Sequence, residues 1–264
     1  MLNVTPDSFS DGGRYLDAGR AVEHALEMEA AGAAIVDVGG ESTRPRGARE
    51  VPAEIELMRV APVLKRLGRR LRIPISIDTR HAIVARAALD YGAAIINDVS
   101  ALEFDPEMAS LAARTRCTVV LMHMRGGPGT HMRFARYHDV VLEVRQYLAS
   151  RAGFAAAAGI ANSRIIIDPG IGFSKSAVHN LKIIAALPSL CALGYPVLVG
   201  ASRKSFVRKI AGGRARDVEF GTAAVDALAV AAGASIIRVH DPGAEAAVAK
   251  MAAAIAGRIP RWHH

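Results

Sequence analysis

Short runs of β-branched residues alternate with longer, alanine-rich amphipathic segments along the whole chain. The short runs predict strands at 2–4, 34–38, 75–77, 95–97, 118–122, 165–167, 197–199 and 236–239. Helical spacing of apolar residues is clearest at 18–31, 53–67, 82–91, 140–157 and 222–232. Strands that alternate with helices form a parallel sheet, and eight such units close into a barrel. The pattern therefore predicts an α/β fold, the (β/α)₈ or TIM barrel.

A recurring pentapeptide marks the step from helix to strand. Gly32, Gly92 and Gly233 each begin a Gly-Ala-(Ala or Ser)-Ile-(Val or Ile) segment. Glycine can end a helix in the left-handed conformation, and the β-branched pair that follows favours a strand. No linker or change of composition divides the chain, so we expect one domain over residues 1–264.

Polar residues gather where the predicted strands end. They follow seven of the eight strands, at 3–13, 37–45, 78–79, 97–98, 168–173, 200–205 and 238–241. In a barrel of this kind the carboxyl ends of all strands meet on one face, which carries the active site. Charged groups in such a buried position are unfavourable without a partner or a ligand. The pattern predicts an enzyme site on this face.

Three of these residues point to a heterocyclic ligand. Asp78, Asn97 and Asp168 place two carboxylates and an amide around the barrel mouth. A carboxylate binds two adjacent N–H donors bidentately, as on a guanidine-like ring edge. Each residue could instead cap a helix or brace a neighbour, and Asp168 could serve the turn that Pro169 and Gly170 make.

Basic residues near the last two strands point to an anion. Arg238 and His240 alternate by two, so we expect their side chains to point the same way. An arginine fork and an imidazole beside a helix start form an anion site. Arg238 could instead pair with a barrel carboxylate. Lys204 lies between Gly200 and a helix start, where a phosphate-bearing small molecule can approach.

Composition narrows the class of partner. The net charge is +8, but the basic residues are scattered, and their densest run, at 66–72, has no interleaved aromatic residues. This is typical of a solvated helix end, and we expect no nucleic-acid partner. Cys117 and Cys191 form no disulfide or zinc pattern, which suits a reducing cytoplasm. No uncharged apolar run is long enough to cross a membrane.

Eight motifs, in order along the chain, resemble those of the dihydropteroate synthase family. They are LNVTPDSFSDGG at 2–13, GGESTRP at 39–45, SIDT at 76–79, IND at 96–98, LMHM at 121–124, DPGIGF at 168–173, SRKSF at 202–206 and RVHD at 238–241. The first, sixth and seventh are nearly diagnostic. The resemblance covers most of the chain and implies a pterin-binding TIM barrel.

The resemblance implies a transferase of folate biosynthesis. Such enzymes condense 6-hydroxymethyl-7,8-dihydropterin pyrophosphate with p-aminobenzoate, by an S_N1-like route, into 7,8-dihydropteroate and pyrophosphate. By motif position, the catalytic set comprises Asn3, Asp78, Asp168, Lys204, Arg238 and His240. Asp78, Asn97, Asp168 and Lys204 would hold the pterin, and Val99, Met122 and Gly200 would line its pocket.

The remaining implied sites concern the anion and the second substrate. Asn3, Arg238 and His240 would hold the pyrophosphate, and Asn3, Asp7 and Asp11 would bind Mg²⁺. The residues around p-aminobenzoate would be Phe9, Thr43, Arg44, Pro45, Phe173, Lys204 and Ser205. The resemblance also implies a homodimer and inhibition by sulfonamides.

The chain departs from the family's sequence pattern at two places, and two alternative functions stay open. The family has several residues before the Asn-Val-Thr-Pro segment, so we expect a shortened first strand here. Ser174 stands where the family often has glycine.

A pterin-binding methyltransferase barrel would share the pterin pocket but would not need the segment at 202–205 or the Arg238 and His240 site. A pterin-binding paralogue without catalysis would keep every residue and differ only in an assay.

Overall fold

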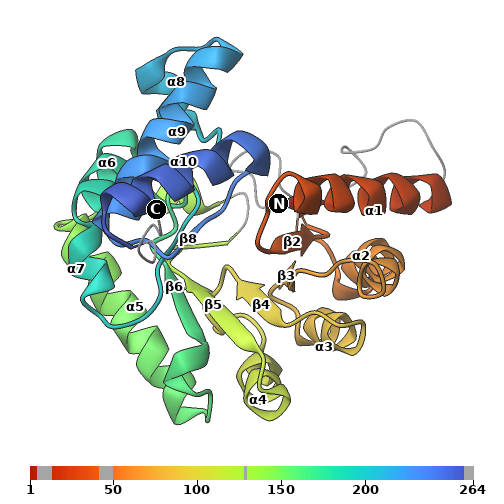
Figure 1. The fold of residues 1–264 in the computed structure, drawn as a ribbon. Coiled ribbons are helices and arrows are strands. Elements are labelled where there is room, and N and C mark those ends of the chain that lie inside the picture. Colours follow the sequence, from red (N-terminus) through yellow and green to blue (C-terminus); the bar gives the residue numbers. More distant parts are fainter. Residues whose placement is uncertain (5–13, 42–49, 128–129, 259–264) are drawn as a thin grey trace.

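The computed structural model describes residues 1–4, 14–41, 50–127 and 130–258, in which strands and helices alternate (Figure 1). The strands are β1 (Leu2–Asn3), β2 (Val36–Gly39), β3 (Ile75–Asp78), β4 (Ile95–Asp98), β5 (Thr118–Met122), β6 (Ile165–Asp168), β7 (Leu198–Val199) and β8 (Ile236–Ile237). The α-helices are α1 (Arg14–Ala30), α2 (Ala53–Leu67), α3 (Ala82–Asp90), α4 (Pro106–Thr115), α5 (Val140–Ala157), α6 (Ala177–Ala185), α7 (Leu187–Cys191), α8 (Ser205–Ala211), α9 (Ala215–Ala232) and α10 (Pro242–Ile255).

The strands form the predicted barrel. β1 to β6 pair in sequence order as one parallel sheet, and β7 pairs with β8. An isolated parallel bridge between Ile167 and Val197 joins the two sheets. The amino group of Met1 donates to the carbonyl oxygen of Val239 at 2.8 Å, which brings the chain start beside β8. The helices surround the strands (Figure 1), so the (β/α)₈ prediction is confirmed.

The first and last strands are short. β1 pairs with β2 only at Leu2↔Val38 and Asn3↔Gly39, as expected for a shortened first strand. The eighth strand ends at Ile237, two residues before the predicted end. The N–H of Arg238 still donates to Val199 O at 2.9 Å, so strand-like pairing extends one residue further.

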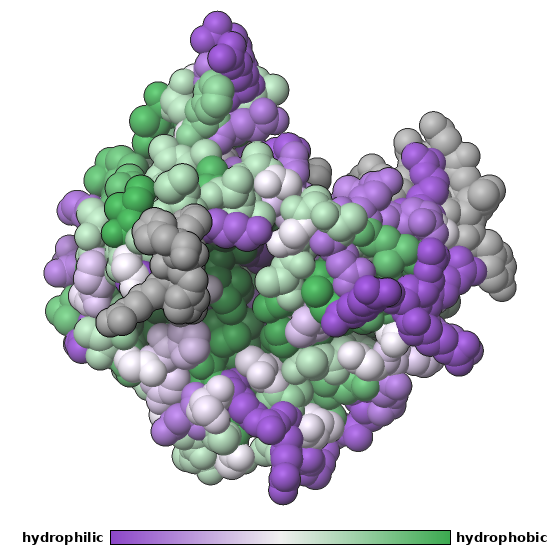
Figure 2. All heavy atoms as spheres, viewed as in Figure 1, coloured by the Kyte–Doolittle hydropathy of each residue, from purple (hydrophilic) through white to green (hydrophobic). Residues whose placement is uncertain are grey.

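The main core lies between the strands and the helices. Successive residues of a strand point to opposite faces, so Ile165 and Ile167 pack outward while Ile166 points into the barrel. The interior cluster of Ile95, Val120, Ile166 and Leu198 is small. A cavity of about 330 Å³, lined by this cluster and by parts of β8, α1 and α10, opens beside it. Figure 2 shows a hollow lined by hydrophobic residues near the centre of the view.

Local predictions hold at the helix ends. Gly32, Gly92 and Gly233 have φ of 96°, 96° and 121°, the conformation expected from the repeat. Cys117 is buried. In the described part of the chain, no helix is both long and apolar enough to cross a membrane.

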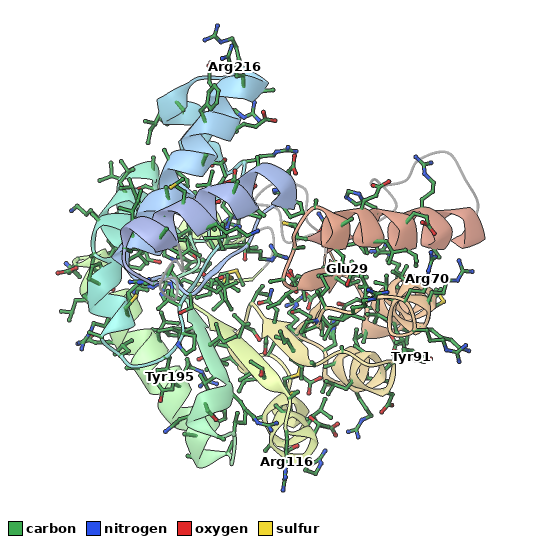
Figure 3. The ribbon with its side chains drawn as sticks, viewed as in Figure 1. Glu29, Arg70, Tyr91, Arg116, Tyr195 and Arg216 are labelled. Atoms are coloured by element: carbon green, nitrogen blue, oxygen red, sulfur yellow. The ribbon has the colours of Figure 1, made fainter. Side chains whose placement is uncertain are left out.

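Basic side chains are spread around the outside of the helix ring. Arg70, Arg116 and Arg216 lie at separate places on the periphery in Figure 3. Arg70 forms an exposed ion pair with Glu23 at 2.7 Å.

Candidate active site

Carboxylates and an arginine meet at the mouth of the barrel. Arg238 Nε donates to Asp37 Oδ2 at 2.6 Å, and its Nη2 donates to Asp78 Oδ2 at 2.7 Å. Asn97 Nδ2 donates to the same Asp37 oxygen at 3.1 Å. The strand register places Gly39 beside Asp78 and Asp78 beside Asn97, which brings these groups together. Pairing of Arg238 with barrel carboxylates, an alternative from the sequence, is what the structure shows.

The two carboxylates paired with Arg238 differ in acidity. Burial raises the pKa of Asp78 to about 7, and the charge of Arg238 only partly opposes this effect. Burial also acts on Asp37, but Arg238 and a hydrogen bond from Ser76 hold the pKa of Asp37 below its usual value. Asp37 is therefore the ionised partner of Arg238. Asp78, whose Oδ2 accepts from Arg238 Nη2, holds its proton to a higher pH than Asp37 does.

Asp168 ends β6 and starts a tightly turned loop. Its Oδ1 accepts the N–H of Gly170 at 2.7 Å, so Asp168 shapes the turn, as one reading of the sequence expected. Gly170 has φ of 66°, and a Cβ there would lie 2.0 Å from the carbonyl oxygen of His123. Only glycine fits this position. Burial raises the pKa of the Asp168 carboxyl, while the positive charge of Lys204 acts in the opposite direction.

Lys204 connects the loop after β6 with the loop after β7. Its Nζ donates to the carbonyl oxygen of Ile171 and lies 4.3 Å from the ring centroid of Phe173. A Cβ at Gly172 would lie 2.5 Å from Lys204 Cδ, so the lysine side chain runs against a bare backbone. Burial lowers the pKa of Lys204 to about 8, and Arg238 adds to this effect. At neutral pH the group is mainly a cation.

His240 contacts the loop after β7. Its Nδ1 is 3.0 Å from Ser202 Oγ, and burial lowers its pKa to about 4. The ring is therefore neutral at pH 7. Asn3, Arg203 and His240 line one cavity of about 570 Å³ on the β1 side. Arg238 and His240 thus have different hydrogen-bond partners.

The other predicted residues fall into two groups. Val99 and Met122 are buried, Ser205 begins α8, and a Cβ at Gly200 would lie 3.6 Å from Arg238 Cβ. Those outside the described residues are Asp7, Phe9, Asp11, Thr43, Arg44 and Pro45.

Asp37 was expected only as one of the polar strand ends, without a role, and His131 and Lys175 belong to no predicted site. Asp37 had a usable signal, since it precedes the GGESTRP motif on a predicted strand. Lys175 is almost fully buried, and its Nζ contacts the carbonyl oxygens of Gly170 and Phe173, each at 3.0 Å. No pattern in the sequence indicates these contacts.

No cluster of three or more histidine, cysteine or acidic residues suited to a metal occurs within residues 1–4, 14–41, 50–127 and 130–258. Asn3, which the resemblance assigns to Mg²⁺, is half-buried at the end of β1. Asp7 and Asp11 would complete a set of oxygen donors, the ligand type that Mg²⁺ prefers.

A (β/α)₈ barrel with a charged site at its carboxyl-terminal face defines the class as an enzyme. The family model described as pterin binding enzyme matches residues 1–240. A dihydropteroate synthase from Mycobacterium leprae is 50% identical over 248 residues, 91% of this chain and 87% of the relative. One from Synechocystis is 44% identical and covers 97% of this chain and 88% of the relative. The chain belongs to the dihydropteroate synthase family of pterin-binding enzymes.

Solved structures agree with this assignment. A dihydropteroate synthase from Clostridium difficile, determined in the presence of pteroic acid, has a TM-score of 0.90 at 40% identity, covering 96% of this chain and 94% of that one. The Xanthomonas albilineans enzyme with 4-aminobenzoic acid has a TM-score of 0.88 at 44% identity, covering 98% and 92%. A Yersinia pestis enzyme in a sulfonamide complex has a TM-score of 0.90 at 39% identity, covering 97% and 92%.

Proposed function

We propose that this chain condenses 6-hydroxymethyl-7,8-dihydropterin pyrophosphate with p-aminobenzoate to give 7,8-dihydropteroate and pyrophosphate. The observation that carries the proposal is the joint presence, at one barrel mouth, of Asp78, Asn97 and Asp168 with the cations of Lys204 and Arg238. Carboxylates suit the N–H edge of a pterin, and cations suit a pyrophosphate leaving group. The family assignment supports both halves of the site.

In this reaction the bond from the pterin methylene to the pyrophosphate oxygen breaks, and its electron pair leaves with pyrophosphate. The aniline nitrogen of p-aminobenzoate then forms the new C–N bond and loses a proton. In an S_N1-like route, positive charge develops on the pterin before attack. Asp78 and Asp168, buried at the mouth, would stabilise that charge electrostatically. An amine needs no general base to attack a cation.

Arg238 is the proposed contact to the leaving group, with Asn3 and His240. Its Nη1 is directed at the sulfur of Met1 at 3.4 Å, a weak acceptor. This nitrogen could therefore donate to a phosphate oxygen in place of the sulfur, while the other two keep Asp37 and Asp78. The neutral ring of His240 would donate a hydrogen bond to the pyrophosphate and would contribute no positive charge.

We further propose Mg²⁺ as the cofactor, held by Asn3 together with Asp7 and Asp11. These side chains offer oxygen donors, and Asn3 shares a cavity with Arg203 and His240. When bound, the ion would neutralise charge on the pyrophosphate.

The second substrate would lie against Phe173, Lys204 and Ser205, with Phe9, Thr43, Arg44 and Pro45 completing the pocket. The pairing of the Lys204 ammonium with the Phe173 ring suits a ligand that is both aromatic and anionic. The pterin would be lined by Val99, Met122 and Gly200. We expect sulfonamides, which bind the Yersinia pestis relative, to compete at this pocket.

We propose a cytoplasmic homodimer of single-domain chains spanning residues 1–264. Large apolar side chains are exposed on the neighbouring helices α9 and α10. They include Leu228, Met251 and Ile255, at 63%, 64% and 79% exposure. Such a surface is typical of an interface.

The test follows pyrophosphate release from the dihydropterin pyrophosphate, with and without p-aminobenzoate and Mg²⁺. Formation of dihydropteroate that requires Mg²⁺ supports the proposal. No release from folded protein that still binds the pterin would favour a paralogue without catalysis. Methyl transfer to or from a pterin, with no pyrophosphate release, would favour the methyltransferase alternative.

A further inference from the structure

A fully buried histidine lies beneath the loop that follows β6. His131 begins a short 3₁₀ turn (His131–Phe134) before α5 and has no exposed surface. Its Nδ1 accepts the N–H of Ser174 at 3.0 Å. Its ring centroid lies 5.3 Å from that of Phe173, with the planes tilted by 51°. One side chain therefore contacts two consecutive residues of the loop.

Ser174 holds a conformation that it does not favour. Its φ is 51°, in the left-handed region, where a residue with a Cβ is strained. The hydroxyl accepts the N–H of Arg125 at 2.8 Å and donates to the carbonyl oxygen of Arg125 at 2.9 Å. Together with the bond to His131, these contacts keep the strained backbone in place.

Phe173 depends on this backbone for its position. It stands between two residues with positive φ, Gly172 at 83° and Ser174 at 51°. A change at either residue would redirect its ring. Lys204 Nζ lies 4.3 Å from the centroid of the Phe173 ring, so the position of the ring also affects the position of the Lys204 ammonium.

We propose that His131 is a positioning residue that fixes Phe173, and Lys204 through it, and thereby sets the affinity for the p-aminobenzoate ring. The inference rests on the proposed function, in which Phe173 and Lys204 contact that substrate. His131 itself contacts the loop and no reacting atom.

The hydrogen bond defines the form of the ring that is needed. Nδ1 must accept, so the neutral ring carries its proton on Nε2, which is buried and has no hydrogen-bond partner among the described residues. Burial lowers the pKa of His131, and the charges of Lys204 and Lys175 lower it further. The ring therefore remains neutral, and the Ser174 N–H keeps its acceptor.

Two kinds of substitution distinguish the contact of the His131 ring with Phe173 from the acceptor that Nδ1 offers to the Ser174 N–H. His131→Phe keeps a ring against Phe173 and removes the acceptor, and His131→Gln places its polar atoms away from the Nδ1 position. His131→Asn puts an amide oxygen near the place of Nδ1. His138→Phe, at an exposed histidine seven residues away, is the matched control.

Steady-state kinetics on the full chain should separate the two substrates. We expect His131→Phe to raise the KM for p-aminobenzoate about tenfold, the effect of one unsatisfied buried donor. The KM for the pterin substrate should rise less than that for p-aminobenzoate, because Asp78 and Asn97, on β3 and β4, would still hold the pterin if Lys204 shifts. His131→Asn should recover most of the loss, and His138→Phe should match the wild type.

The outcomes are distinct from those that test the function itself. A wild-type chain that makes no dihydropteroate refutes the proposed function. An active wild type with an unchanged p-aminobenzoate KM in His131→Phe overturns the role of His131. An equal rise in both KM values would also overturn it, since that indicates general loosening. If His131→Phe does not fold, His131→Gln replaces it with the same expectations.

Discussion

The two halves of the barrel differ in how firmly they are built. From β2 to β6, strands of four or five residues pair in continuous parallel register and are almost wholly buried. The seam of β7, β8 and β1 consists of two-residue strands. The two-residue pairing of β1 with β2 and the bridge from Ile167 to Val197 tie it to the rest, and the Met1 amino group joins its two ends at Val239, beside a cavity of about 330 Å³.

The site draws on both halves. Asp78, Asn97 and Asp168 come from the firm half, where their positions follow from strand register. Lys204, Arg238, His240 and Asn3 come from the seam. Groups proposed to bind the pterin face are therefore mostly rigid, whereas groups proposed to follow the departing anion stand on the less constrained side. Less tightly packed segments are the ones expected to move during a catalytic cycle.

The largest expected effect concerns a seam residue that acts on chemistry rather than on folding. Lys204→Ala should lower kcat by roughly 100- to 1000-fold, since one preorganised cationic donor at the site is lost. The melting temperature should change by only a few degrees, because the Lys204 ammonium donates to a single loop carbonyl. Lys209→Ala, on the exposed side of α8, is the control. A collapse in melting temperature would instead make Lys204 structural.

The next largest effect is the loss of unfolding free energy when a buried aliphatic side chain is truncated in each half of the barrel. Ile167→Ala in β6 should lower the free energy of unfolding by about 3 kcal/mol, as for a fully buried aliphatic side chain. Leu198→Ala in β7 should cost about 1 kcal/mol less, because Leu198 already borders the cavity and has fewer contacts to lose. Urea denaturation of both variants decides this. Equal losses would show that the two halves are packed alike.

The stability of the protein is expected to depend on pH through a pair of carboxyl groups on α9 and α10. Asp226 on α9 is fully buried, and burial together with Glu245 on α10 raises its pKa to about 8. The folded state holds this proton more tightly than the unfolded state, so stability falls as pH rises from about 4 towards 8. Asp226→Asn should remove that fall, raising stability at pH 8 relative to pH 6 by roughly 2 kcal/mol against the wild type.

Thermal unfolding between pH 5 and 9 checks the Asp226 prediction. Asp90→Asn, at an exposed aspartate ending α3 in the firm half, is the control and should leave the pH profile unchanged. A wild-type profile that does not decline towards pH 8 would contradict the assignment of the proton to the Asp226 and Glu245 pair.

The smallest effect comes from filling the seam cavity. Ala249 on α10 lines it, so Ala249→Leu should raise the free energy of unfolding by about 1 kcal/mol through added apolar contact. Ala185→Leu, at an exposed position that ends α6, should not. A destabilised Ala249→Leu would mean that the cavity cannot accept a side chain from this position.

Local pattern determined the elements of this protein. The order of strands and helices, the left-handed glycines and the polar strand ends all follow from spacing and residue type, because these depend on neighbours in the chain. The shared face of Asp78, Asn97 and Asp168 also followed, since parallel strands end on one side. The motifs selected the family for the same reason, as they are local runs of residues.

Partners across the barrel were decided only by the tertiary structure. Arg238 pairs with Asp37, 201 residues away, and His240 Nδ1 lies beside Ser202 Oγ, 38 residues away. His131 bonds to Ser174 across 43 residues, and Lys175 is buried against His123 across 52. Such contacts depend on which loops the closed barrel brings together and on the space left between them. Spacing along the chain carries no signal for either.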